Sequence, residues 1–175
     1  MALFWRALAT VLLVGLLTLP EPLWSQPTSP APTPSLVDTV EQGYLAHRRG
    51  DFDQAIAIFT SIIRRRGLTI KERAVTYLLR GESKRDKGNL DEAVNDFTRA
   101  INQWPNYPQA IFFRGQALAN LGRFSEALAD LTRAVELDPA RESYKTTLEL
   151  LKVKMEKAGI DLTIHPTDLK APLED

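Results

Sequence analysis

Three segments of the chain carry apolar residues at the same six offsets: 0, 3, 4, 7, 10 and 11. This spacing places all six side chains on one face of an amphipathic α-helix. The stripes run from Phe52 to Ile63, from Leu90 to Ile101 and from Phe124 to Val135. Three helices with one shared pattern indicate an internal repeat, in which each unit covers the apolar face of its neighbour.

Each stripe is preceded by a glycine and, before that, by another helical stretch. The glycines are Gly50, Gly88 and Gly122, and glycine suits the left-handed conformation that ends a helix. Pro105 and Pro139 follow the second and third stripes, where a proline stops helical continuation. The predicted unit is therefore a helix, a tight glycine turn, a second helix and a break.

This unit resembles the tetratricopeptide repeat, which has a period of about 34 residues. The three copies are residues 36–69, 74–107 and 108–141. The second and third copies match the family pattern at Gly81, Gly88, Ala93, Phe97, Ala100 and Pro105, and at Gly115, Gly122, Ala127, Leu131, Ala134 and Pro139. The first copy departs from it, because Ile62 and Gly67 replace a small residue and the proline. The resemblance implies an all-α fold, a right-handed superhelix of antiparallel helix pairs.

The first two stripes start 38 residues apart, whereas the second and third start 34 apart. The four extra residues fall between the first two stripes, around residues 64–73. Thr69 and Glu72 have the spacing of a capping box there, which would start the next helix about one turn early. We expect either a longer first helix in the second unit or a wider loop before it.

Two polar pairs recur at the same places in the second and third units. They are Arg80 with Asp96 and Arg114 with Asp130. Each Arg precedes the glycine at which the two helices of a unit approach, so we interpret the pairs as ion pairs that clip these helices together. The first unit has Gln42 and Ile58 at the equivalent positions and so lacks both partners. Because a catalytic site does not normally come in two copies one repeat apart, we favour a structural role.

Residues 142–159 form one more amphipathic helix, which ends at Gly159. Its apolar face consists of Tyr144, Leu148, Leu151 and Met155, and Glu and Lys residues occupy the other side. A stack of helix pairs needs a polar-backed helix at its open end to remain soluble. We predict that this helix caps the stack and that residues 160–175 form a C-terminal tail.

Residues 1–25 differ from the rest of the chain. Arg6 precedes an apolar run from Ala7 to Leu19, which is short for a membrane span but has the length of a signal-peptide core. A cleaved signal peptide and an uncleaved N-terminal anchor, tethering the protein to a membrane through residues 3–19, both fit this run. Residues 26–35 are rich in Pro, Ser and Thr and are typical of a semi-rigid linker. In either case we expect the repeats to lie outside the cytoplasm, in the periplasm, a lumen or the extracellular space.

Composition excludes several classes of function. The chain has 22 basic and 22 acidic residues, and this balance argues against a nucleic-acid partner. It has no cysteine, which excludes disulfides, thiolate metal sites and cysteine nucleophiles. The two histidines, His47 and His165, have no neighbours at metal-ligand spacing, and no catalytic or phosphate-binding motif is present. We therefore expect neither a metal nor another cofactor, and no enzymatic activity.

In the tetratricopeptide repeat family the first helices of the units line a concave groove. The resemblance implies these groove positions: Tyr44, His47, Leu78, Glu82, Arg85, Phe112, Gln116 and Asn120. The best-known groove of the family clamps a C-terminal carboxylate with Lys and Asn. The corresponding positions here are Val40, Tyr44, Leu78, Glu82, Phe112 and Gln116, so that clamp is absent.

We expect instead an apolar groove with polar flanks, which suits an amphipathic helix or an extended apolar segment. The alternative is that the groove aromatics only pack against neighbouring helices. The resulting hypothesis is an exported or membrane-tethered adaptor that binds a protein or peptide and supports the assembly or regulation of an envelope or membrane complex. The competing hypothesis is a structural module that forms homo-oligomers through its repeat ends and uses no groove ligand.

Overall fold

The computed structural model describes residues 34–160, and all of the secondary structure in this range is helical. The predicted signal or anchor segment, most of the linker and nearly all of the tail lie outside the described residues. The helices are α2 (Leu36–Arg48), α3 (Phe52–Ile63), α4 (Ile70–Lys87), α5 (Leu90–Gln103), α6 (Pro108–Asn120), α7 (Phe124–Leu137) and α8 (Glu142–Lys157). Within residues 34–160, no helix is both long enough and apolar enough to cross a bilayer.

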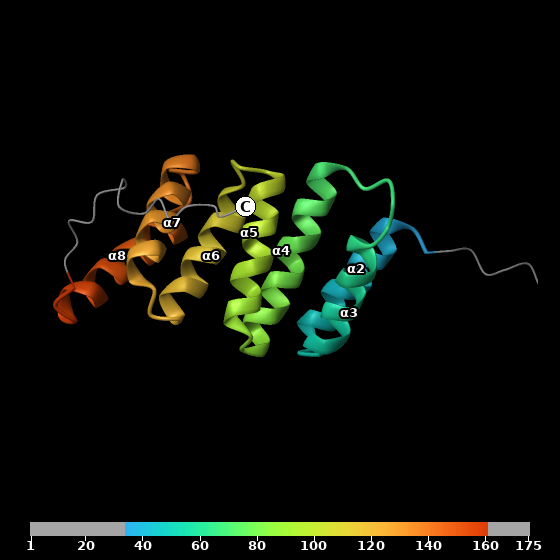
Figure 1. Cartoon of the computed structure of the whole chain (residues 1–175), viewed down its shortest axis with the longest axis horizontal. Coiled ribbons are helices and arrows are strands. Elements are labelled where there is room, and N and C mark those ends of the chain that lie inside the picture. Colours follow the sequence, from blue (N-terminus) through green and yellow to red (C-terminus); the bar gives the residue numbers. More distant parts are fainter. Residues whose placement is uncertain (1–33, 161–175) are drawn as a thin grey trace, which may run out of the picture. The chain divides into compact units, whose positions relative to one another are not determined.

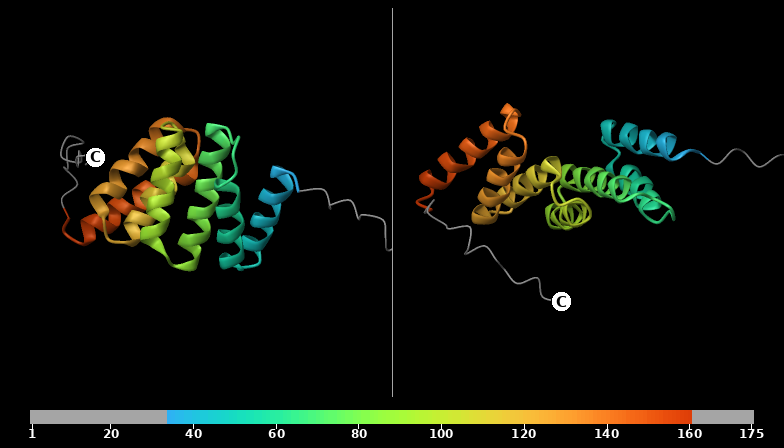
Figure 2. Two further views of the ribbon diagram at one scale, coloured as in Figure 1. Left: turned by 45° about the vertical axis from the view of Figure 1, so that its right-hand side comes forward. Right: turned by 90° about the horizontal axis from the view of Figure 1, so that it is seen from above.

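The helices pack in chain order as three pairs and a single last helix (Figure 1). The pairs are α2 with α3, α4 with α5 and α6 with α7, and α3, α5 and α7 each also pack against the helix that follows them. The further views in Figure 2 show the same succession. The prediction of an all-α stack of helix pairs with a single terminal helix is confirmed.

Glycine determines both the turns and the closeness of each pair. Gly88 ends α4 at a φ of 96°, a left-handed conformation that other residues rarely adopt. Gly81 lies in the middle of α4 against the ring of Phe97, and a Cβ atom at this position would lie 2.6 Å from Cε1 of that ring. The helices of this pair can therefore approach only because residue 81 has no side chain.

The four extra residues lengthen α4. Thr69 caps this helix, its hydroxyl accepts from the backbone N–H of Glu72, and the Glu72 carboxylate accepts from the backbone N–H of Thr69. The predicted capping box is thus confirmed. α4 has 18 residues, whereas α6, the first helix of the next pair, has 13. Of the two expected outcomes, the longer first helix is the one observed.

The terminal helix α8 covers the last pair with the predicted apolar face. Tyr144, Leu148, Leu151 and Met155 are all buried. The Tyr144 ring stacks on Phe112 of α6, with 4.3 Å between the ring centroids. Within residues 34–160 no second helix pairs with α8, so it is the last helix of the described stack.

Candidate functional site

The repeated Arg and Asp residues form two-pronged ion pairs within their helix pairs. Arg80 donates from Nε to Asp96 Oδ2 at 2.8 Å and from Nη2 to Oδ1 at 2.6 Å. Arg114 donates in the same way to Asp130, at 2.7 and 2.8 Å. These bonds join the first helix of each unit to the second.

Each of these arginines also reaches the preceding unit. Arg80 donates from Nη1 to Thr60 of α3 at 3.0 Å, and Arg114 donates from Nη1 to Thr98 of α5 at 3.2 Å. The pairs therefore belong to the contact between units as well as to the unit itself. This explains why the first unit has Gln42 and Ile58 instead, since no repeat precedes it within the described residues. The pairs therefore belong to the scaffold.

The side chains at equivalent positions of the first helices change in character along the stack. Tyr44, Glu82, Gln116 and Leu150 share one position in α2, α4, α6 and α8. Tyr44 is 46% exposed and Leu150 is 66% exposed, whereas Glu82 and Gln116 are half-buried. We call this the first-helix face, and it has apolar ends and a polar centre.

The expected apolar centre of this face is not present. Leu78 is 2% exposed and Phe112 is 7% exposed, so both belong to the core and neither offers a surface to a ligand. Phe112 is covered by the ring of Tyr144. For Phe112, then, the alternative that groove aromatics pack against neighbouring helices is the one observed.

A polar network joins three of the predicted groove residues across α2, α4 and α6. His47 Nε2 lies 3.3 Å from Asp86 Oδ2. Asp86 accepts a hydrogen bond of 2.9 Å from Arg85 Nε, and Arg85 donates from Nη1 to Gln116 at 3.4 Å. The Arg85 guanidinium also lies 4.7 Å from the centroid of the Phe113 ring. The polar centre is therefore fixed in place by bonds between successive first helices.

His47 has acceptors near both ring nitrogens. Its Nδ1 lies 3.0 Å from the Ser83 hydroxyl oxygen, and that hydroxyl donates to the Leu79 carbonyl. The Ser83 oxygen is thus left to accept from Nδ1, while Nε2 faces the Asp86 carboxylate. Both ring nitrogens of His47 therefore have a polar partner.

Glu82 lies beside this network without joining it. The half-buried Glu82 carboxylate makes no hydrogen bond or ion pair with another residue of the range 34–160. Burial raises the pKa of Glu82 to about 7, against a smaller lowering by Arg85, and the charge of Asp86 raises it further. A carboxylate that is partly removed from water and has no donor is a favourable contact for a cationic or N–H group of a ligand.

An apolar hollow of about 210 Å³ lies between α2 and α4. Its walls are Leu36, Val40, Val75 and Thr76, and Lys71 and Glu72 stand at its edge. The Glu72 carboxylate is engaged by Thr69, and the Lys71 ammonium lies 5.2 Å from the centroid of the Trp104 ring. The chemistry of the hollow is thus that of its apolar walls.

The other predicted groove residues lie outside the network. Tyr44 is near the guanidinium of Arg48, at 6.0 Å from the ring centroid, and Asn120 is an exposed residue at the end of α6. Sequence reasoning missed Asp86, Ser83 and the hollow. The insertion before α4 was the sequence signal for the hollow. It makes α4 about one turn longer than α2, and the hollow lies between these two first helices.

No part of this face is suited to hold a metal. The described residues contain no group of three or more His, Asp or Glu side chains that could bind an ion. The chemistry available on the first-helix face is therefore that of hydrogen bonding, charge and apolar contact.

Comparison with known proteins assigns the repeats. A tetratricopeptide repeat family model matches residues 78–142, which include most of α4 and all of α5, α6 and α7. The chain thus contains tetratricopeptide repeats (TPRs). A search of curated protein sequences gives no significant match.

Solved TPR structures share the fold of this chain. The TPR domain of Arabidopsis OM64 is 25% identical, and the match covers 66% of this chain and 93% of that domain with a TM-score of 0.61. The second TPR domain of human RPAP3, solved in complex with an HSP70 peptide, is 26% identical, with coverages of 66% and 93% and a TM-score of 0.60. The Yersinia enterocolitica type III secretion chaperone SycD, solved with a peptide of the translocator YopD, is 18% identical, with coverages of 68% and 93% and a TM-score of 0.61. At that identity the likeness to SycD concerns the fold alone.

Proposed function

We propose that this TPR protein is an adaptor that binds a segment of another protein along its first-helix face. The observation that carries the proposal is the exposure of apolar side chains at both ends of this face, including Tyr44 and Leu150, around a polar centre that is held rigid. Exposed apolar side chains at the two ends of the face can anchor the apolar residues of a partner segment that runs along it. A rigid, bonded centre lowers the conformational cost of binding.

The similar TPR domain of RPAP3 supports a peptide ligand, because it was solved in complex with an HSP70 peptide. The ligand of the present chain differs in chemistry. Where the family's carboxylate clamp would place Lys and Asn, this chain has Val40, Tyr44 and Glu82 among others. Glu82 would repel a carboxylate, so an acidic C-terminal tail is not the ligand that we propose.

We further propose that the adaptor works outside the cytoplasm, exported or tethered through residues 3–19, and supports the assembly or regulation of an envelope or membrane complex. The apolar run from Ala7 to Leu19 is the basis for this location. N-terminal sequencing of the native protein tests it. A start near Gln26 would indicate a cleaved signal, and an intact start in the membrane fraction would indicate an anchor. An intact protein in the cytoplasmic fraction would contradict both.

Affinity capture with the full chain and with two double variants tests groove binding. Tyr44→Glu with Leu150→Glu places two charges on the first-helix face at exposed positions, so the fold is preserved. Asn95→Glu with Gln103→Glu places two charges at exposed positions of the second helix α5 and serves as the matched control. We expect a partner that is retained by the wild type and the control and lost by the first-helix variant. Equal capture by all three proteins would contradict the proposal.

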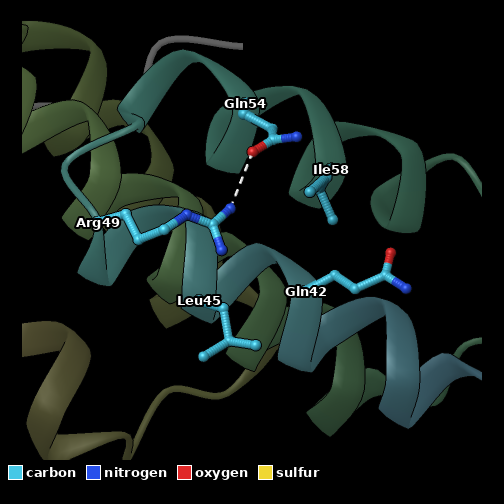
Figure 3. A pocket seen from close by; sticks show the side chains of 5 residues that line it. All are labelled: Gln42, Leu45, Arg49, Gln54 and Ile58. Carbon is cyan, nitrogen blue, oxygen red and sulfur yellow. Dashed lines mark hydrogen bonds between the residues drawn. The ribbon is translucent and has the colours of Figure 1, made fainter.

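A second candidate function, self-association, is favoured by the end of the first unit that no other helix of residues 34–160 covers. A pocket of about 210 Å³ opens there between α2 and α3, lined by Gln42, Leu45, Arg49, Gln54 and Ile58 (Figure 3). In later units the equivalent of Gln42 is the Arg that contacts the preceding unit, and the equivalent of Ile58 is the Asp that pairs with this Arg. Here the face is more apolar, and Leu45 is exposed. The molar mass in solution, measured over a range of protein concentrations, separates the two candidate functions. If this end is an interface between copies, the wild type should form oligomers and Leu45→Glu should lower their mass.

A further inference from the structure

The first-helix face combines two features that select different parts of a ligand. One is the apolar hollow between Val40 and Val75, and the other is the carboxylate of Glu82, which has no partner among residues 34–160. Val75 and Glu82 are seven residues apart on α4, so they lie on the same side of the helix. Two helical turns separate them by about 10 Å.

We propose that the partner segment is basic and apolar: it inserts one large apolar side chain into the hollow and places a Lys or Arg against Glu82. This inference rests on the proposed function and specifies its ligand. The hollow, at about 210 Å³, has room for a single side chain of the size of Leu, Phe or Met. The exposed lining of the hollow is almost entirely apolar, so a polar group inserted there would lose most of its hydrogen bonds.

The charges around Glu82 determine the sign of the second contact. The positive charge of Arg85 is engaged by Asp86 and by the ring of Phe113. Asp86 is shared between Arg85 and His47. Arg48 and Lys71, the cations at the hollow end of this face, each lie over an aromatic ring. Glu82 is thus the charged group of this face whose carboxylate is still without a partner among residues 34–160, and a cation of the ligand would form a charge-assisted hydrogen bond with it.

The separation of the two features fixes the spacing in the ligand. An extended segment of the polyproline II type advances about 3.1 Å per residue with three residues per turn, so the apolar and basic residues on its bound side would be three positions apart. A helical segment advances about 1.5 Å per residue and would place them seven positions apart. The same geometry therefore predicts one of two spacings, according to the conformation of the bound segment.

Selection from a displayed library of random 12-residue peptides, with the full chain as bait, tests the inference. We expect the enriched peptides to carry a large apolar residue and a Lys or Arg at one of the two spacings. Val40→Phe fills the hollow, and Val37→Phe, an exposed position on the same helix, is its control. At pH 8, above the pKa of about 7, Glu82 is ionised and Glu82→Gln removes its charge; Glu136→Gln, at an exposed position of α7, is the control.

A selected peptide should bind about tenfold more weakly to Val40→Phe and to Glu82→Gln than to the wild type, and both controls should bind it normally. Enrichment of acidic or neutral peptides, or an unchanged preference in Glu82→Gln, would overturn the inference while leaving groove binding intact. Failure of every protein to select a peptide would overturn both. A Lys170→Glu variant changes the charge of the C-terminal tail. If this variant selects peptides and the wild type does not, the chain's own tail occupies the site, and the proposal of a segment from another protein is overturned.

Discussion

Arg80 and Asp96 form a two-pronged ion pair that is almost completely removed from solvent, with 1% of the Asp96 side chain exposed. Arg80 also donates to Thr60 of the preceding unit. One arginine thus connects three helices, α3, α4 and α5. The bonds of the pair largely offset the hydration that both groups lose on burial. Removing one partner is therefore costly, because it leaves the other charge buried and less well compensated.

Replacing Arg80 by Met should lower the free energy of unfolding by about 1–3 kcal/mol, because the buried Asp96 carboxylate loses a two-pronged partner and keeps Lys84, 2.9 Å away, and the more distant Arg99. The matching variant Arg114→Met should cost a similar amount, because the Arg114 side chain is 22% exposed but Asp130 pairs with no other cation among residues 34–160. Urea denaturation measures both. Arg99→Met, at an exposed position near Asp96, is the control and should change little. A melting temperature unaffected by Arg80→Met would refute the structural role of the pair.

Gly81→Ala should destabilise the fold by roughly 1–3 kcal/mol, although alanine is the better helix former. The added Cβ would lie 2.6 Å from the Phe97 ring and would push α4 away from α5. Gly115→Ala should cost less, because its nearest neighbour, Leu131, is 3.0 Å away. Thermal denaturation of the two variants tests the order. Greater stability of Gly81→Ala would show that the helices are not in close contact.

Glu82 should make stability depend on pH. Burial raises its pKa to about 7 from an ordinary value of 4.5, so the folded protein keeps a proton that the unfolded chain has already lost. The resulting stabilisation is complete below about pH 4.5 and is lost as the pH rises through about 7. Glu82→Gln cannot ionise, and it should gain roughly 1–3 kcal/mol over the wild type between pH 5 and pH 8. The free energy of unfolding of both proteins, measured at pH 5 and pH 8, tests this. A difference between variant and wild type that is the same at both pH values would contradict the burial of the carboxylate.

Leu151 and Leu150 are neighbours on α8 with opposite roles. Leu151 is packed against the stack, whereas Leu150 is on the first-helix face. Leu151→Asp should detach the terminal helix, lower the free energy of unfolding by at least about 2 kcal/mol and cause self-association. Leu150→Asp should leave both unchanged. Light scattering and thermal denaturation distinguish the two, and equal behaviour would show that α8 is not a cap.

The sequence predicted those features that depend on short-range patterns. The capping box at Thr69 needs four residues, and the stripe that begins at Leu90 needs one helix, so both could be read directly. The pairing of Arg80 with Asp96 was visible because the spacing is repeated in the next unit. The contact of Arg80 with Thr60 could not be predicted from the sequence, because it depends on how two units are placed against each other.

The same limit explains the error at the centre of the first-helix face. A helical pattern places Leu78 and Phe112 on one side of their helices, but it does not show which neighbour covers that side. In the structure Tyr144, from a helix outside the repeats, covers Phe112. The hollow beside Val75 likewise arises from the unequal lengths of two helices that are distant in sequence.

The proposed function depends on the binding of a partner segment by the first-helix face. A photo-crosslinking amino acid placed in the full chain at Tyr44, and separately at Glu136 on α7, tests it most directly in the native cell. We predict that position 44 gives a crosslinked product with a second protein and that position 136 does not. The same product from both positions, or only crosslinks between copies of this chain, would contradict the account.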